Sequence, residues 1–364
     1  MRDGATRVDV PYLWPSTLRA PIRPPKLVYL DLLHWIGLAK AMTGHPDAKS
    51  ATEALDACMR ARAEGRALFP IADAIYIEVS KIKQHRQRRD IRLAIEALSG
   101  YFVVTSRPTI AKHEIEAVLD RVVGPNPDPI NTMDYLDWGV ARAFGRVGGF
   151  RVRHKTRGDI TEEVRAQFRQ KPAAFDTILA TAELELQRRT LDGPTSQDEE
   201  DALRAYGWKP SGGMEISENR AHQEVEQVGR FNSDPRWRSG RIRDVVAARE
   251  VFIEIDEMLF RGLSDRGATI GDVFDSPAVT RSQLDVMPSF DVAVSMKTEY
   301  HRDPHHRWTT NDIHDIDALA STIPYCDLVV TDKAAAAAAN RSGLAARLDT
   351  VVLARLDDLT GHLL

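Results

Sequence analysis

Residues 311–333, NDIHDIDALASTIPYCDLVVTDK, place carboxylates on both sides of a short, strongly apolar run. Asp312 and Asp315 lie three residues apart before an apolar helical pattern, so they share one face near the start of a helix. Asp332 follows the run Leu-Val-Val-Thr, which is typical of a buried strand. These aspartates are either helix caps and turn residues, or ligands that converge on a cation.

Two further carboxylates occupy positions of the same kind near the start of the chain. Asp31 directly follows the strand-like run LVYL at 27–30. Ligands of open α/β sheets gather at the carboxyl ends of parallel strands, so Asp31 and Asp332 would share one crevice if their strands are parallel neighbours. Glu78, in PIADAIYIEVSKI, lies on an otherwise apolar helix, where a carboxylate is costly unless it has a partner.

Other aspartates of the opening stretch have simpler interpretations. Asp327 precedes its strand and is interpreted as a turn residue, while Asp317 faces away from Asp315 and is interpreted as a solvated surface charge. Asp312 could also serve only the helix dipole, with Thr309 as the cap. If several carboxylates do meet, they repel one another, and a divalent cation removes that conflict. An all-oxygen ligand set suits Mg²⁺ or Mn²⁺ rather than zinc.

The alternation of strands and helices at the two ends of the chain predicts one α/β sheet assembled from both termini. Strands are predicted at 27–30, 67–70, 101–105, 327–331 and 349–353. Between 106 and 285 strand-like runs almost disappear, and long polar helices are predicted at 159–191, 214–230 and 241–262. We therefore expect an extended Pro- and Arg-rich arm at 1–25, an α/β unit made of 26–105 and 286–364, and a helical insertion or subdomain at 106–285.

The composition is that of a globular protein with a core. The 364 residues are 43% hydrophobic and 28% charged, and they suffice for one large domain or two. The formal net charge of -4 excludes a uniformly basic nucleic-acid coat, and two cysteines exclude a disulfide framework or a four-cysteine zinc site. The first residues lack the apolar core of a signal peptide, and no apolar run approaches the roughly 20 residues that span a bilayer. We expect a cytoplasmic protein that does not enter a membrane.

Taken together, four acidic segments resemble the PIN-domain nucleases. That family places its first aspartate right after the first strand, as LVYLD does here at Asp31, and an acidic residue on an early helix, as YIEVSKI does at Glu78. Its third acidic position opens a helix about sixteen residues before the threonine of a late strand motif, as Asp315 does before Thr331. Its fourth follows that strand, as Asp332 does in LVVTDK.

The resemblance implies a three-layer α/β/α sandwich with a mainly parallel sheet and a Mg²⁺- or Mn²⁺-dependent endonuclease activity, usually on RNA. Asp31, Glu78, Asp315 and Asp332 would be the catalytic, metal-binding residues, and Asp312 is an additional metal ligand at the third position. The chain departs from the pattern in length, because a minimal PIN domain is far shorter than the span from Asp31 to Asp332. A large insertion must separate the second and third acidic positions, and Asp332 follows the threonine more closely than in many members.

A cationic segment directly follows Glu78. The stretch SKIKQHRQRRDIR at 80–92 contains the five residues that we assign to nucleic-acid binding, Lys81, Lys83, Arg86, Arg88 and Arg89. Such a segment beside an acidic site suits a polyanionic substrate, although it is also what a solvated helix face looks like. RNA is the expected partner. The alternatives are a structure-specific DNA nuclease and a catalytically inactive PIN-like scaffold that binds RNA or protein.

Overall fold

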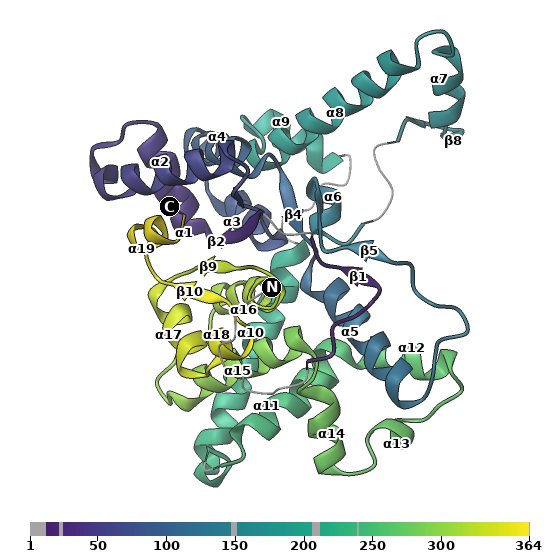
Figure 1. Cartoon of the computed structure of the whole chain (residues 1–364), viewed down its shortest axis with the longest axis vertical. Helices are drawn as coiled ribbons and strands as arrows, with labels where there is room; N and C mark the ends of the chain where they lie inside the picture. The colour runs from purple at the N-terminus through teal and green to yellow at the C-terminus, as the bar shows by residue number, and fades with distance from the viewer. Residues whose placement is uncertain (1–11, 22–24, 147–150, 206–211, 239, 364) are drawn as a thin grey trace.

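The largest sheet of the described residues is parallel, and its strands come from both ends of the chain (Figure 1). The computed structural model describes residues 12–21, 25–146, 151–205, 212–238 and 240–363. Within them the sheet has the order β10–β9–β2–β3. These strands are β2 (Lys26–Leu30), β3 (Ala67–Leu68), β9 (Leu328–Val330) and β10 (Val351–Leu353). The protein is thus a mixed α/β structure that is mostly helical.

Pairing between β2 and β9 joins segments that lie 300 residues apart. The two strands are parallel neighbours, with Leu30 opposite Val330. Asp327 fixes this register, because its carboxylate accepts from Leu27 N at 2.8 Å while its own N–H donates to the Leu27 carbonyl at 2.9 Å. Asp327 therefore has a structural role at the start of β9. The condition for Asp31 and Asp332 to share one edge of the sheet is met.

Three small pairs of strands complete the β-structure of the described residues. The predicted strand at 101–105 forms as β4 (Phe102–Val104), but it pairs antiparallel with β6 (Leu136–Trp138) and reaches the main sheet only through a bridge between Ile71 and Val103. The other pairs are β1 (Leu18–Arg19) with β5 (Met133–Asp134), and β7 (Arg153–His154) with β8 (Gly158–Asp159). Part of the predicted arm, 1–11 and 22–24, lies outside the described residues, and the rest is anchored through β1.

Helices flank the sheet on two sides (Figure 1). One group packs together as α1 (Leu32–Met42), α2 (Lys49–Ala63), α4 (His85–Ser99) and α19 (Leu356–Leu363). The other group contains α15 (Pro288–Arg302), α16 (Thr310–Thr322), α17 (Lys333–Arg341) and α18 (Leu344–Arg347). Both α3 (Asp73–Lys81) and α5 (Arg107–Val122) pack against α16. The sheet edge after β2 and β9 therefore opens toward elements of both groups.

The middle of the chain is helical, as predicted; the helix predicted at 214–230 is present, but the other two are divided. Breaks divide the predicted helices at 159–191 and 241–262, the second through a π-helical turn at Val251–Ile255. The elements are α6 (Val140–Ala143), α7 (Thr161–Gln167), α8 (Pro172–Asp192), α9 (Gln197–Ala205), α10 (Gly212–Ser233), α11 (Ile242–Glu250), α12 (Asp256–Asp265), α13 (Ile270–Val273) and α14 (Pro277–Leu284). Among the described residues, no helix combines the length and apolar character that crossing a membrane requires.

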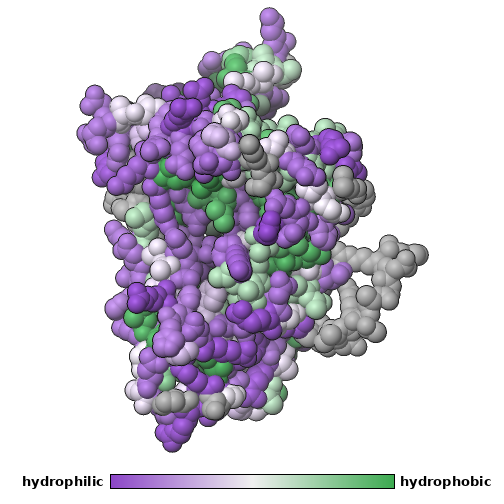
Figure 2. All heavy atoms as spheres, turned by 90° about the vertical axis from the view of Figure 1, so that its left-hand side faces the viewer, coloured by the Kyte–Doolittle hydropathy of each residue, from purple (hydrophilic) through white to green (hydrophobic). Residues whose placement is uncertain are grey.

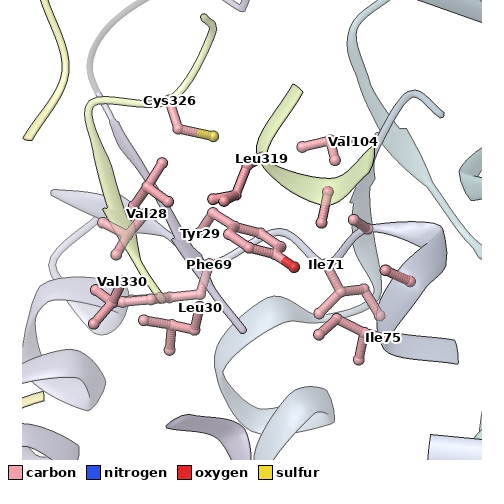
Figure 3. Close-up of a cluster of buried hydrophobic side chains, with 14 of the residues drawn as sticks. Val28, Tyr29, Leu30, Phe69, Ile71, Ile75, Val104, Leu319, Cys326 and Val330 are labelled. Carbon is pink, nitrogen blue, oxygen red and sulfur yellow. The ribbon is translucent and has the colours of Figure 1, made fainter. Parts of the chain in front are cut away.

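Two hydrophobic clusters form the core. The first lies around the main sheet, where Val28 and Val330 from adjacent strands pack with Phe69 and with Leu319 of α16 (Figure 3). The second lies among α5, α11, α12 and α15. Residues of the middle segment contribute to both clusters. Seen from the side of α2, α17 and α19, the surface is mainly hydrophilic with smaller hydrophobic areas (Figure 2).

Candidate functional site

Asp31 and Asp332 lie at the carboxyl ends of neighbouring parallel strands and cap the helices that follow. The Asp31 N–H extends the β2–β9 ladder by donating to the Val330 carbonyl at 3.0 Å. Its carboxylate accepts from His34 N at 3.3 Å, at the start of α1. The Asp332 carboxylate accepts from Ala334 N at 2.6 Å and Ala335 N at 3.2 Å. Capping explains the position of each residue, and it leaves acceptor capacity on each carboxylate.

Asp315 and Glu78 reach the same region from two packed helices. Asp315 lies on α16 and Glu78 on α3, and both side chains are half-buried. Burial, followed by the nearby carboxylate of Glu78, raises the pKa of Asp315 to about 8. Asp31, Asp332 and Asp312 contribute smaller parts of the same shift. These side chains are therefore close enough to disfavour one another's charge.

The pKa values of Glu78 and Asp31 are raised in the same way. Burial, together with Asp31, raises the pKa of Glu78 to about 7, although Lys81 opposes the shift. Burial raises the pKa of Asp31, and Asp332 adds to the effect against the influence of His34. The His34 ring is itself fixed, because Nε2 donates to the Thr331 carbonyl at 3.0 Å. Carboxylates from both ends of the chain therefore lie close enough together to repel one another.

Asp312 has a structural explanation of its own. It forms a capping box with Thr309, whose N–H and hydroxyl donate to Asp312 Oδ2 at 2.6 and 2.8 Å. The other oxygen lies 3.4 Å from His306 Nε2. Burial works against ionisation, but His306 and Thr309 outweigh it and lower the pKa of Asp312. Unlike Asp315, Asp312 already has its charge compensated by protein groups.

The carboxylates do not form a closed coordination shell. Among the described residues, no three His, Cys, Asp or Glu side chains are arranged so that they could hold one metal ion. Their chemistry nevertheless fits a hard cation, because the donors are oxygens, half-buried and mutually repelling. Binding would require the side chains to rotate toward one another.

A hollow borders the same edge of the sheet. It has a volume of about 390 Å³ and is lined by His34 and Lys40 of α1 and by Arg355, which follows β10. Crevices at the carboxyl ends of parallel strands are the usual ligand sites of open α/β sheets. Asp47 and Asp357 also line the hollow, and Arg355 pairs with Asp357, so two carboxylates balance the two cations.

Asp317 is not the solvated charge that the sequence suggested. Its side chain is 23% exposed and lies between Arg107 Nη1 at 2.6 Å and Arg220 Nη1 at 2.5 Å. These ion pairs lower the pKa of Asp317 in spite of its burial. The pairs connect α5 and α10 to α16, so Asp317 positions the helix that carries Asp315. The arginines lie 210 and 97 residues away, which no local pattern could indicate.

Sequence reasoning also missed Asp73, in the first turn of α3. Burial, and then the proximity of Asp317, raises the pKa of Asp73 to about 7. The carboxylate accepts from Ala74 N at 2.9 Å. An aspartate directly before the apolar run that contains Glu78 was the available signal.

The cationic segment divides into exposed and structural residues. Lys83, Arg86 and Arg89 are exposed, while Lys81 is half-buried and donates to His314 Nδ1 at 3.1 Å. Arg88 is 8% exposed and donates to the carbonyls of Ile82, Asp192 and Pro194. The assignment of Arg88 to nucleic-acid binding is therefore replaced by a structural role, in which it holds the end of α8 against α4.

Neither protein-family models, curated proteins nor solved structures provide a match to this chain.

Proposed function

We propose that this protein is a metal-dependent endoribonuclease with a PIN-like α/β/α sandwich as its catalytic unit. The observation that carries the proposal is the meeting of Asp31, Glu78 and Asp315, three carboxylates with raised pKa values, near the edge of a parallel sheet where Asp332 also lies. Protein folds rarely keep such repulsion without a purpose, and perturbed groups cluster at functional sites.

Asp31, Glu78, Asp315 and Asp332 would hold Mg²⁺ or Mn²⁺, and Asp312 would add negative potential beside them. When bound, such an ion activates water and neutralises charge on a phosphodiester during in-line displacement. In the metal-free chain Asp315 retains a proton at neutral pH, because its pKa is about 8. His34 and the helix N-termini of α1 and α17 keep Asp31 and Asp332 oriented toward the common edge.

The exposed cations support a nucleic-acid substrate. Lys83, Arg86 and Arg89 follow the helix that bears Glu78. Phosphate groups placed there would be attracted by side chains that flank the acidic edge. RNA is the proposed substrate, and a structure-specific DNA nuclease is the alternative within the same chemistry.

The test is cleavage of end-labelled single-stranded RNA, duplex DNA and flap DNA in Mn²⁺. We expect the wild-type chain to cut RNA, and Asp31→Asn or Asp315→Asn to abolish the cut. Asp198→Asn, at an exposed position of α9, is the matched control and should cleave normally. Cleavage by Asp315→Asn at the wild-type rate would remove that residue from the mechanism, and cleavage of flap DNA alone would favour the alternative.

The open arrangement of the carboxylates favours one second candidate, an inactive PIN-like scaffold that binds RNA or protein. This candidate predicts RNA binding that EDTA does not alter, and no cleavage with any divalent ion. The proposed nuclease predicts instead that Mn²⁺ binds to the wild-type chain and that Asp31→Asn weakens this binding, measured by calorimetry without substrate.

A further inference from the structure

A cleft far along α17 from Asp332 is lined by four arginines. Its volume is about 400 Å³, and its arginines are Arg243, Arg302, Arg341 and Arg347, from α11, α15, α17 and α18. We call it the arginine cleft. Three carboxylates also line it, so the arginines outnumber the acids.

Asp291, a buried residue that lines the cleft, fixes the positions of Arg243 and Arg347. Its side chain is 4% exposed, and it accepts from Arg243 Nη2 at 2.8 Å and from Arg347 Nη2 at 2.8 Å. Ser295 Oγ accepts from Arg243 Nη1 at 2.9 Å. Because a buried carboxylate already fixes these two guanidinium groups, they lose less side-chain entropy when a ligand binds.

The other two arginines leave donors available. Arg341 Nε donates to Glu299 Oε2 at 3.2 Å, and Arg302 pairs with the other oxygen of the same carboxylate. The side chains of Arg302 and Arg341 are 60% and 62% exposed. Within the described part of the chain these are their only side-chain hydrogen bonds, so most of their N–H groups can serve a ligand.

Thr298 supplies an independent indication of a ligand. This residue is 3% exposed and lines the arginine cleft, and its hydroxyl has no hydrogen-bond partner in the described structure. Buried hydroxyl groups are nearly always hydrogen-bonded, since an unpaired one loses its bonds to water without replacement. The oxygen atom is itself buried, so an acceptor oxygen in the cleft would satisfy it once neighbouring side chains shift.

We propose that the arginine cleft binds a phosphate group, supplied either by a nucleic-acid strand or by a free mononucleotide. Guanidinium forks beside a hydroxyl are the donors that suit phosphate oxygens. Asp332 caps the start of α17 and Arg341 ends it. Nine residues of helix separate them by about 13 Å, roughly four nucleotide steps of a double-helical strand. Only the strand as source rests on the proposed nuclease function.

Binding is measured on the full chain in EDTA, so that cleavage plays no part. The probes are adenosine 5′-monophosphate and a short single-stranded oligouridylate without terminal phosphates. The variant E299Q/R302Q/R341Q removes both exposed guanidinium groups without leaving Glu299 unpaired. Arg157→Gln is the control, because Arg157 is an exposed, ion-paired arginine and its loss changes the net charge equally. Arg341→Lys retains the charge and tests the fork alone.

We expect the triple variant to weaken binding about tenfold or more, Arg341→Lys to weaken it less, and Arg157→Gln to bind as the wild type does. A loss for the oligouridylate identifies a strand as the source, and a loss for the mononucleotide alone identifies a free nucleotide. Unchanged binding of both probes by a folded triple variant or by Arg341→Lys, or an equal loss in Arg157→Gln, overturns the proposal. Binding of the mononucleotide in EDTA needs neither metal nor cleavage, which separates this outcome from failure of the proposed nuclease.

Discussion

Asp31, Glu78, Asp315 and Asp332 form what we call the acidic edge of the sheet. Among the three whose pKa values are raised, Asp315 has the highest pKa, about 8, and is therefore the most costly to ionise. Its pKa is about 8 in the folded chain and lies near the ordinary aspartate value when unfolded, so ionisation destabilises the fold as pH rises between these values. In metal-free buffer at pH 8, we expect Asp315→Asn to be more stable than wild type by about 1–3 kcal/mol. Urea unfolding at several pH values measures the difference, which should vanish near pH 4. A variant that is less stable at pH 8 would contradict the repulsion.

Glu114 offers a second test, away from the acidic edge. This carboxyl is fully buried, and it accepts from Ser289 N at 3.0 Å and Ser289 Oγ at 2.6 Å. Burial outweighs these bonds and raises the pKa of Glu114 to about 7. The pKa of Glu114 is near 4.5 in the unfolded chain and about 7 in the folded chain. The free energy of unfolding therefore falls as the pH rises from 4.5 to 7. We expect Glu114→Gln to flatten the stability profile in that window, measured by urea unfolding. A profile as steep as that of the wild type would contradict the assignment.

Sequence reasoning at the residue scale succeeded where position along an element decides the outcome. Asp31 and Asp332 were placed at strand ends because an apolar run marks the strand and the next residue leaves it. It failed for Asp317 and Arg88, because burial and partners from distant segments decide their roles. The sequence gives the spacing of charged residues along a helix. It does not show which face of that helix will be covered by a segment far away in the chain.

At the element scale, α16 is held by charges as well as by apolar packing. Arg220 of α10 is 16% exposed and pairs with Asp317 and with Glu254 at 2.7 Å. Removing one partner of a buried pair leaves uncompensated charge, so we expect Arg220→Met to cost about 3 kcal/mol of unfolding free energy. The surface pair of Arg204 with Glu200 provides the control, and Arg204→Met should cost less than about 1 kcal/mol. Equal effects of the two variants would show that the buried pair is not special.

The elements that were predicted correctly are those with strong local signals. Strands β2, β9 and β10 contain consecutive Val and Leu residues, and the helices between them have periodic apolar faces. The strands β5 to β8 were missed, because each contains only two or three residues and forms where a partner strand happens to pass. The π-helical turn likewise has no sequence signature in the residues Val251–Ile255.

At the scale of the whole molecule, the proposed metal site should couple ion binding to folding. A ligand that binds only the folded chain stabilises it by about 2.7 kcal/mol at one hundred times its dissociation constant. We therefore expect Mn²⁺ to raise the melting temperature of wild type and EDTA to reverse the effect. Asp31→Asn combined with Asp315→Asn should abolish the shift, while Asp198→Asn should retain it. The same Mn²⁺ shift in the double variant would place the ion elsewhere.

The pairing of β2 with β9 also has a consequence for synthesis on the ribosome. β2 is made early, but its neighbour β9 begins only at Leu328, and the nearer partner β3 contacts it through two residues alone. In a nascent chain that has not yet reached Leu328, one edge of the apolar strand Lys26–Leu30 has no partner strand. Exposed apolar strands of this kind are prone to aggregate or to bind chaperones. Since Asp332 arrives with β9, such a chain would also carry an incomplete acidic set. If the chain is the proposed nuclease, its acidic set would thus be completed only after β9 has been synthesised.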